Sequence, residues 1–177
     1  VTSTITEAYF GVTKVLNFKT VDGGNKKIDV KIPAGIRNNE KIRVLGQGKA
    51  GKNGGKNGDL FIRIKIKDSQ NLKLNGIDLY TELPITPWES ALSTKVAITG
   101  IDEEVMVDVP KGIQSGEKII IDDKGYKDGK GGRGKLVVVV KIMMPTTINE
   151  EELKLLKKLK DISNFNPRKA KALWLLT

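Results

Sequence analysis

The chain has 177 residues and a formal net charge of +10, and it contains neither cysteine nor histidine. Without these residues it can form no disulfide, no zinc finger and no cysteine- or histidine-based catalytic centre, so we predict a non-enzymatic protein that needs no metal or cofactor. The lack of cysteine is typical of a reducing compartment, which favours a cytoplasmic location. No apolar run approaches the ~18 residues of a membrane span, so we expect no membrane partner.

The chain begins at Val1 in a segment typical of a strand, without a methionine or a leader sequence, so we expect it to be part of a longer protein. Thr4 and Glu7 have the spacing of a capping box, which predicts a short helix over Thr6–Phe10. Alternating and β-branched side chains then predict four strands: Val12–Thr20, Lys26–Ile32, Lys41–Leu45 and Leu60–Ile66.

The following residues predict the same kinds of element. Thr86 and Glu89 again have capping-box spacing, and Pro87 suits the first position of a helix, which we expect over Pro87–Leu92. Five more segments have the pattern of strands: Asp78–Pro84, Ser93–Thr99, Glu104–Val109, Lys118–Ile121 and Leu136–Ile142.

Two stretches, 30–46 and 107–125, are close copies in which a strand, a P-x-G turn and a second strand follow one another. The copies are offset by about 77 to 81 residues, which indicates a duplicated unit. We therefore predict an all-β fold of two tandem β-sandwich-like subdomains with short helices. The predicted boundaries are 1–68 for the first subdomain, 69–147 for the second, and 148–177 for a C-terminal helix and tail.

The C-terminal segment has a different pattern. Asn149 is a favourable N-cap, and the three glutamates after it suit the positive end of a helix dipole. Leucine and isoleucine then repeat on one face, which predicts an amphipathic helix over about 150–163. The apolar tail carries Leu173, Trp174 and Leu176, for which we favour a dimerisation contact. Occupation of an apolar groove, and an unstructured chain end, are the two alternatives.

Two patterns that could carry chemistry are better explained by loops and turns. Gly46–Gly51 spells G-x-G-x-x-G, but more glycine follows in place of the helix that would hold a phosphate. We predict a mobile hairpin loop there, with 127–134 as its counterpart. The acidic residues 102–104 and 122–123 lie at predicted turns, where we expect them to be solvated rather than catalytic.

Several short motifs occur together in an order that resembles the C-terminal substrate-binding region of DnaJ-family co-chaperones, over roughly residues 1–168. They are the P-x-G turns at 33–35 and 110–112, the glycine-rich loop before Gly58-Asp59-Leu60, the Gly76–Tyr80 segment, and Phe165–Arg168. The histidine of the family's J-domain and the cysteines of its zinc module are both absent here. The resemblance is therefore to the zinc-free class, which includes a curved-DNA-binding branch.

This resemblance implies that the first subdomain carries an apolar groove for an extended hydrophobic peptide. By position, the groove residues are Leu16, Phe18 and Ile62, with Val1 at the edge. Strand alternation independently places Leu16 and Phe18 on one face, although ordinary core residues show the same pattern.

At the matching positions the second copy has Ala97, Thr99 and Val138, which are smaller or polar. We therefore expect the first copy to bind the peptide and the second mainly to space it from a dimer contact.

The predicted function is that of a co-chaperone fragment in the stress response. It would bind exposed hydrophobic segments of unfolded polypeptides, pass them to a DnaK-type ATPase chaperone, and form a homodimer. The alternative is a basic DNA-binding architectural module of the curved-DNA-binding type, which the charge of +10 favours. Lysines scattered over solvated faces would explain the same charge.

Overall fold

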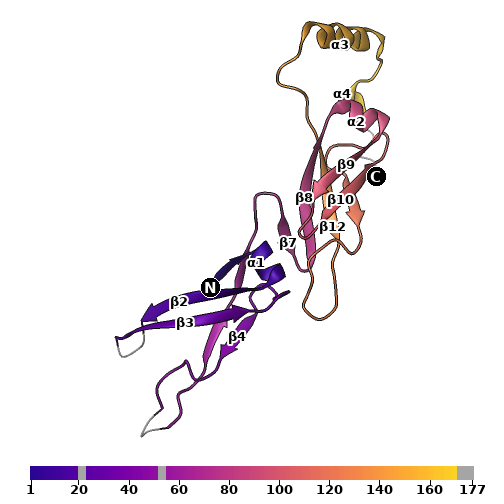
Figure 1. Ribbon diagram of the computed structural model, residues 1–177. Helices are drawn as coiled ribbons and strands as arrows, with labels where there is room; N and C mark the ends of the chain where they lie inside the picture. The colour runs from indigo at the N-terminus through magenta and orange to yellow at the C-terminus, as the bar shows by residue number, and fades with distance from the viewer. Residues whose placement is uncertain (20–22, 52–54, 171–177) are drawn as a thin grey trace. The chain divides into compact units, whose positions relative to one another are not determined.

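A computed structural model describes residues 1–19, 23–51 and 55–170 of the chain (Figure 1). It divides into two compact units, Val1–Met143 and Met144–Thr177. The first unit holds all the strands of the described residues and two short helices, which confirms the predicted all-β fold. The boundary predicted between residues 68 and 69 stays a prediction. No helix within the described ranges is both long and apolar enough to cross a membrane.

The first copy begins with a short strand and a capped helix, followed by two antiparallel pairs. Its elements are β1 (Thr2–Thr4), α1 (Ile5–Phe10), β2 (Val12–Lys19), β3 (Asn25–Ile32), β4 (Lys41–Val44), β5 (Leu60–Arg63) and β6 (Lys65–Lys67). β2 pairs with β3, β4 pairs with β5, and β1 lies parallel to β6 (Figure 1). The predicted strand 60–66 is interrupted at Ile64, because the backbone of Ile64 bonds to Asn39 and Glu40 in the turn before β4.

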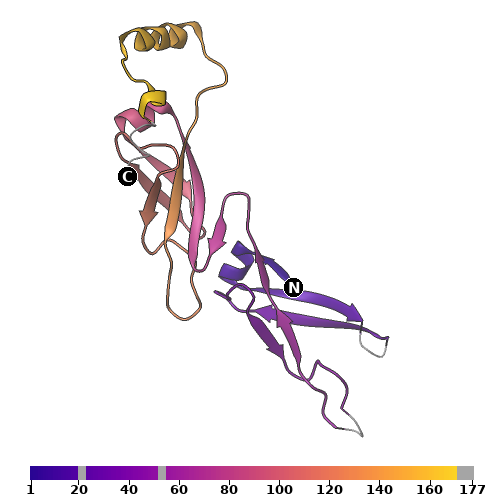
Figure 2. The same cartoon turned by 180° about the vertical axis from the view of Figure 1, so that it is seen from behind.

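The second copy repeats this plan with a larger sheet. Its elements are β7 (Lys73–Asn75), β8 (Asp78–Ile85), α2 (Pro87–Leu92), β9 (Thr94–Thr99), β10 (Glu104–Val109), β11 (Lys118–Ile121) and β12 (Leu136–Ile142). The sheet has the order β11-β12-β8-β7, with β12 parallel to β8, and β9 and β10 form a separate antiparallel pair (Figure 2). The parallel pair β8–β12 is thus the counterpart of β1–β6.

Both predicted capping boxes are present. The hydroxyls of Thr4 and Thr86 accept from the N–H groups of Glu7 and Glu89, whose carboxylates accept from the cap N–H groups in return. Each helix ends at a residue with positive φ, Gly11 at +80° and Ser93 at +69°. The two helices are therefore equivalent from cap to cap.

These caps correct the predicted correspondence between the copies. Val12 starts β2 directly after Gly11 and pairs with Ile32, while Thr94 starts β9 directly after Ser93 and pairs with Val109. Counting inward from these pairs, Leu16 corresponds to Ile98 rather than to Ala97. By the same count Phe18 corresponds to Gly100 rather than to Thr99. Gly100 lies just past the end of β9, which has six residues where β2 has eight. The match of Ile62 with Val138 holds, since these residues pair with Ile42 and Ile119 at equivalent positions.

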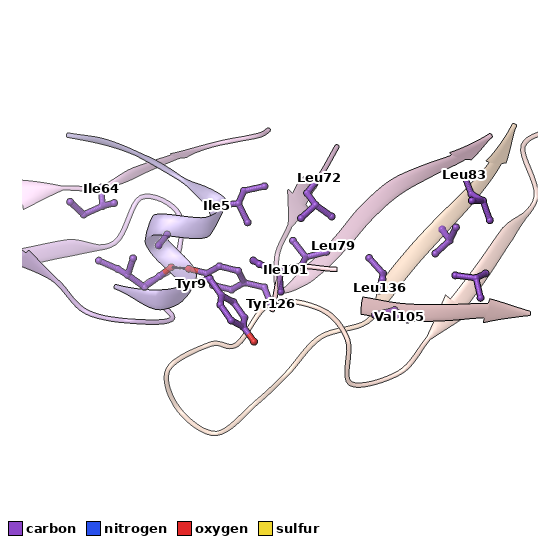
Figure 3. Close-up of a cluster of buried hydrophobic side chains, with 14 of the residues drawn as sticks. Ile5, Tyr9, Ile64, Leu72, Leu79, Leu83, Ile101, Val105, Tyr126 and Leu136 are labelled. Atoms are coloured by element: carbon purple, nitrogen blue, oxygen red, sulfur yellow. Dashed lines mark hydrogen bonds between the residues drawn. The ribbon is translucent and has the colours of Figure 1, made fainter. Parts of the chain in front are cut away.

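One cluster of buried apolar side chains runs through both copies (Figure 3). Strands such as β3 and β10 alternate strictly, with every second residue buried except the half-buried Lys26, as expected for strands with one solvated face. Tyr9 and Tyr126 belong to this cluster, with ring centroids 5.7 Å apart in an edge-on arrangement. Such pairs stabilise beyond the area they bury, by about 0.5–1.5 kcal/mol.

The second unit contains α3 (Glu150–Ile162) and α4 (Pro167–Ala170). Asn149 caps α3 as predicted, in a reciprocal capping box with Glu152. No residue of α3 is buried, and its apolar face, which includes Leu153, Leu159 and Ile162, is exposed. The amphipathic helix is thus confirmed.

Candidate functional site

The strand predicted to carry the groove has a free edge. Among the described residues, β2 pairs only with β3, so its other edge has no strand partner. Such an edge presents unpaired N–H and C=O groups that can pair with another chain. An extended peptide could therefore add to β2 as a further strand.

Leu16 and Phe18 lie on the inward face of this strand, where alternate residues are half-buried. Both pack against the buried cluster. Phe18 also lines a surface hollow of about 500 Å³ near the end of the hairpin, together with Asn17, Lys19, Asn25, Lys26 and Lys27. These two side chains thus combine contact with the core and partial access to solvent.

The other two predicted groove residues differ from this pair. Ile62 is only 7% exposed and is a member of the core, so it could form no more than the floor of a groove. Val1 is exposed and lies beside the start of β6, where its ammonium donates to the Arg63 carbonyl at 2.9 Å and its carbonyl accepts from the N–H of Lys65. The assignment of all four residues to a peptide site stays a prediction.

The second copy has a hollow of its own, of about 780 Å³. Its apolar lining includes Leu83, Pro84, Ile98 and Val139, and Tyr80 contributes an aromatic ring. Ile98 is the counterpart of Leu16, so the second copy keeps one of the two groove positions apolar. Gly100 leaves the position of Phe18 without a side chain, and this is the clearest chemical difference between the two hairpins.

A row of cations lies on the outer face of the first copy. Arg63, Lys65 and Lys67 alternate with inward-facing isoleucines, and Lys41 is paired in register with Arg63 across β4 and β5. All four are exposed, and none forms an ion pair with another described residue. Their charge is therefore available to an anionic partner.

One of the predicted solvated carboxylates is bound to other side chains instead. Asp102 lies in a turn as predicted, but its side chain is only 17% exposed, and it accepts a hydrogen bond from the Tyr9 hydroxyl and pairs with Arg133 at 2.7 Å. Burial alone would raise the pKa of Asp102, but the Tyr9 hydrogen bond and the Arg133 pair outweigh it and hold that pKa below its usual value. Burial, followed by the hydrogen bond to Asp102, raises the pKa of Tyr9.

The second glycine-rich loop is closed as a hairpin, as predicted, and the mobility predicted for it stays a prediction. The Asp128 carboxylate accepts from the N–H groups of Lys130 and Gly132, both at 2.9 Å, and Lys127 forms a β-bridge with Arg133. These bonds hold the loop together. Only the aspartate within the glycine run could have indicated this in the sequence.

No group of three or more carboxylates is arranged to hold a metal ion in the part of the chain that the structure describes. The predicted dimerisation residues Leu173, Trp174 and Leu176 lie outside the described residues.

The geometry defines a strand-rich module in which β2 has one edge without a strand partner and a half-buried inward face that includes Leu16 and Phe18. Residues 1–145 match the DnaJ C terminal domain family, and the chain belongs to that family.

The chain is similar to the "Curved DNA-binding protein" of Pseudomonas putida (strain GB-1), with 38% identity over 81% of this chain and 45% of the relative. It is also similar to the "Curved DNA-binding protein" of Escherichia coli O1:K1 / APEC, with 41% identity over 81% of this chain and 47% of the relative. It therefore spans a little less than half the length of these curated relatives.

Proposed function

We propose that the first copy binds exposed hydrophobic segments of unfolded polypeptides, by adding them as a strand along the free edge of β2. The observation that carries this proposal is the combination, on one strand, of an edge without a partner and two half-buried apolar side chains, Leu16 and Phe18. Main-chain hydrogen bonds would bind any extended sequence, while alternate apolar side chains of the peptide would contact this pair.

Within the whole protein, we propose that this binding delivers polypeptides to a DnaK-type ATPase chaperone, in a cytoplasmic homodimer that is not itself an enzyme. Membership of the DnaJ C terminal domain family supports this role. Two or three apolar side chains contribute only a few kcal/mol at ~25 cal/mol per Å² before ordering costs. We therefore expect roughly micromolar, readily reversible binding, which suits a protein that must release its substrates.

The test compares the two faces of β2. Leu16→Asp with Phe18→Asp places two charges on the inward face, and Thr13→Asp with Val15→Asp places two charges on the exposed outer face of the same strand. Binding of a fluorescent leucine-rich peptide is followed by anisotropy, with circular dichroism to verify folding. We expect the inward pair to weaken binding about tenfold or more and the outer pair to change it little. Equal affinities for the two folded variants would refute the proposal.

The row of free cations supports a second candidate function, which is binding to DNA phosphates. Arg63, Lys65 and Lys67 stand at every second residue with Lys41 beside them, an arrangement that can follow a phosphate backbone. The names of the relatives point in the same direction.

Salt dependence separates the two functions. If the four cations contact phosphates, the logarithm of DNA affinity should fall with the logarithm of salt concentration at a slope of about −3.6. Replacing Lys65 and Lys67 by glutamine should make the slope shallower by about 2. An unchanged slope in that variant would exclude this surface, and peptide binding should show little salt dependence in either protein.

A further inference from the structure

The P-x-G turn of the first copy packs against the glycine-rich loop of the second. Gly35 has φ +75°, and a Cβ placed there would collide with the backbone of Gly129. Its counterpart Gly112 has φ +83°, but a Cβ there would meet nothing within 4 Å. Both turns require glycine for their backbone conformation, and only the first requires it for close packing as well.

Two polar contacts lie beside this packing. The buried Tyr126 hydroxyl donates to the Ile36 carbonyl at 2.7 Å, and Arg37 pairs with Asp128 at 2.9 Å. The Asp128 carboxylate also organises its own loop, as described above. The loop therefore meets the first copy in a preformed shape, which lowers the entropic cost of the contact.

A third contact reaches α1. The Tyr9 hydroxyl donates to Asp102, and Arg133 from the glycine-rich loop pairs with the same carboxylate. Lys127 lies over the Tyr9 ring, 5.2 Å from its centroid. Figure 3 shows the rings of Tyr9 and Tyr126 side by side between these elements.

We propose that residues 126–133, together with Asp102, form a latch that holds the second copy against α1 and the P-x-G turn of the first. The latch contacts the part of the first copy that adjoins the proposed peptide strand, because α1 is followed at once by β2. The P-x-G turn is joined to the same helix, since the Gly35 N–H donates to the Ala8 carbonyl. Several of its charges are partly exposed, so high salt weakens it. Its release lets the two copies reorient without unfolding either one.

The absence of native cysteine allows a direct test, since Lys31→Cys and Lys118→Cys introduce the only two labelling sites, one on an exposed position of each copy. The distribution of distances between two spin labels is measured in the otherwise unchanged chain, in Gly35→Ala and in Gly112→Ala. We expect the population outside the main distance to rise about tenfold in Gly35→Ala, which corresponds to about 1.4 kcal/mol. The Gly112→Ala distribution should match that of the unchanged chain.

A second pair of variants covers the case in which Gly35→Ala does not fold. Arg37→Gln with Asp102→Asn removes the ion-pair partners of Asp128 and Arg133, one charge of each sign, at the contact that the latch makes. Lys95→Gln with Asp108→Asn removes an ion pair of 2.9 Å that lies wholly within the second copy. If the distribution of distances between the spin labels broadens in Arg37→Gln with Asp102→Asn and not in Lys95→Gln with Asp108→Asn, the proposal is supported. Distributions that match in the latch variant and its control overturn it.

Discussion

The two copies of the duplicated unit share the same order of helix, hairpin and turn, and they differ at the end of the hairpin and in the packing of the turn. Both have a capping box, a short helix that ends at a positive φ, an antiparallel hairpin and a P-x-G turn. The first copy extends its hairpin far enough to present Phe18, whereas the second has Gly100 at that position. The first copy also packs its turn glycine against its neighbour, while the second leaves Gly112 open. Duplication thus explains the architecture, and these local changes can give the copies different tasks.

The largest expected effect concerns the floor of the proposed groove. Ile62→Ala should lower the free energy of unfolding by about 2–5 kcal/mol, because Ile62 is a core residue. Val138→Ala, at the matching buried position, should cost less because fewer methyl groups are lost. Urea denaturation measures both. If Ile62→Ala costs no more than Leu16→Ala, whose side chain is only half-buried, then Ile62 is not part of the core.

An intermediate effect is expected where the copies differ at the strand before the first helix. Ser3, directly before the N-cap Thr4, is 1% exposed, and its hydroxyl has no hydrogen-bond partner among the described residues. Ile85 occupies the same place before Thr86. A buried hydroxyl without a partner is costly, so Ser3→Val should raise the free energy of unfolding by about 1 kcal/mol.

Ile85→Val serves as the control for this substitution, because it places the same residue in the second copy. It should be destabilising by about 0.5–1.5 kcal/mol. Thermal denaturation measures both variants. If Ser3→Val and Ile85→Val both raise the melting temperature, or both lower it, the assigned correspondence is contradicted.

The smallest effect is expected from acid, through the contact between the copies. Because the pKa of Asp102 is depressed in the folded state, its contribution to stability is present above the unfolded-state pKa, and is lost as pH falls through the folded-state value. In Asp102→Asn the free energy of unfolding should therefore fall less steeply as pH is lowered, so the acid limb of its pH profile should be flatter. If the acid limb of Asp102→Asn matches that of the unchanged chain, the Tyr9–Asp102 bond contributes little to stability.

Local signals in the sequence were sufficient for most of the fold. The Thr-x-x-Glu spacing, the P-x-G turns and the period-two alternation each depend on neighbouring residues, and the elements that they predict are present. Contacts between residues far apart in the chain could not be predicted from such local patterns. The interruption at Ile64 arises from bonds to Asn39 and Glu40, and the Tyr9–Asp102 bond joins residues far apart in the chain. The equivalence of Leu16 with Ile98 follows from the two helix caps and the strand register, whereas the matching letters Thr-Lys-Val in the two copies pointed to a register one residue away.

The most direct test of the central claim is amide hydrogen exchange in the presence and absence of a saturating hydrophobic peptide. If the peptide adds as a strand to the first copy, new protection should appear on β2, over residues 12–19, because main-chain hydrogen bonds form along that edge. Residues 94–99 of β9 should exchange at the same rate with and without peptide. New protection on β9 and none on β2 would contradict the assignment of peptide binding to the first copy.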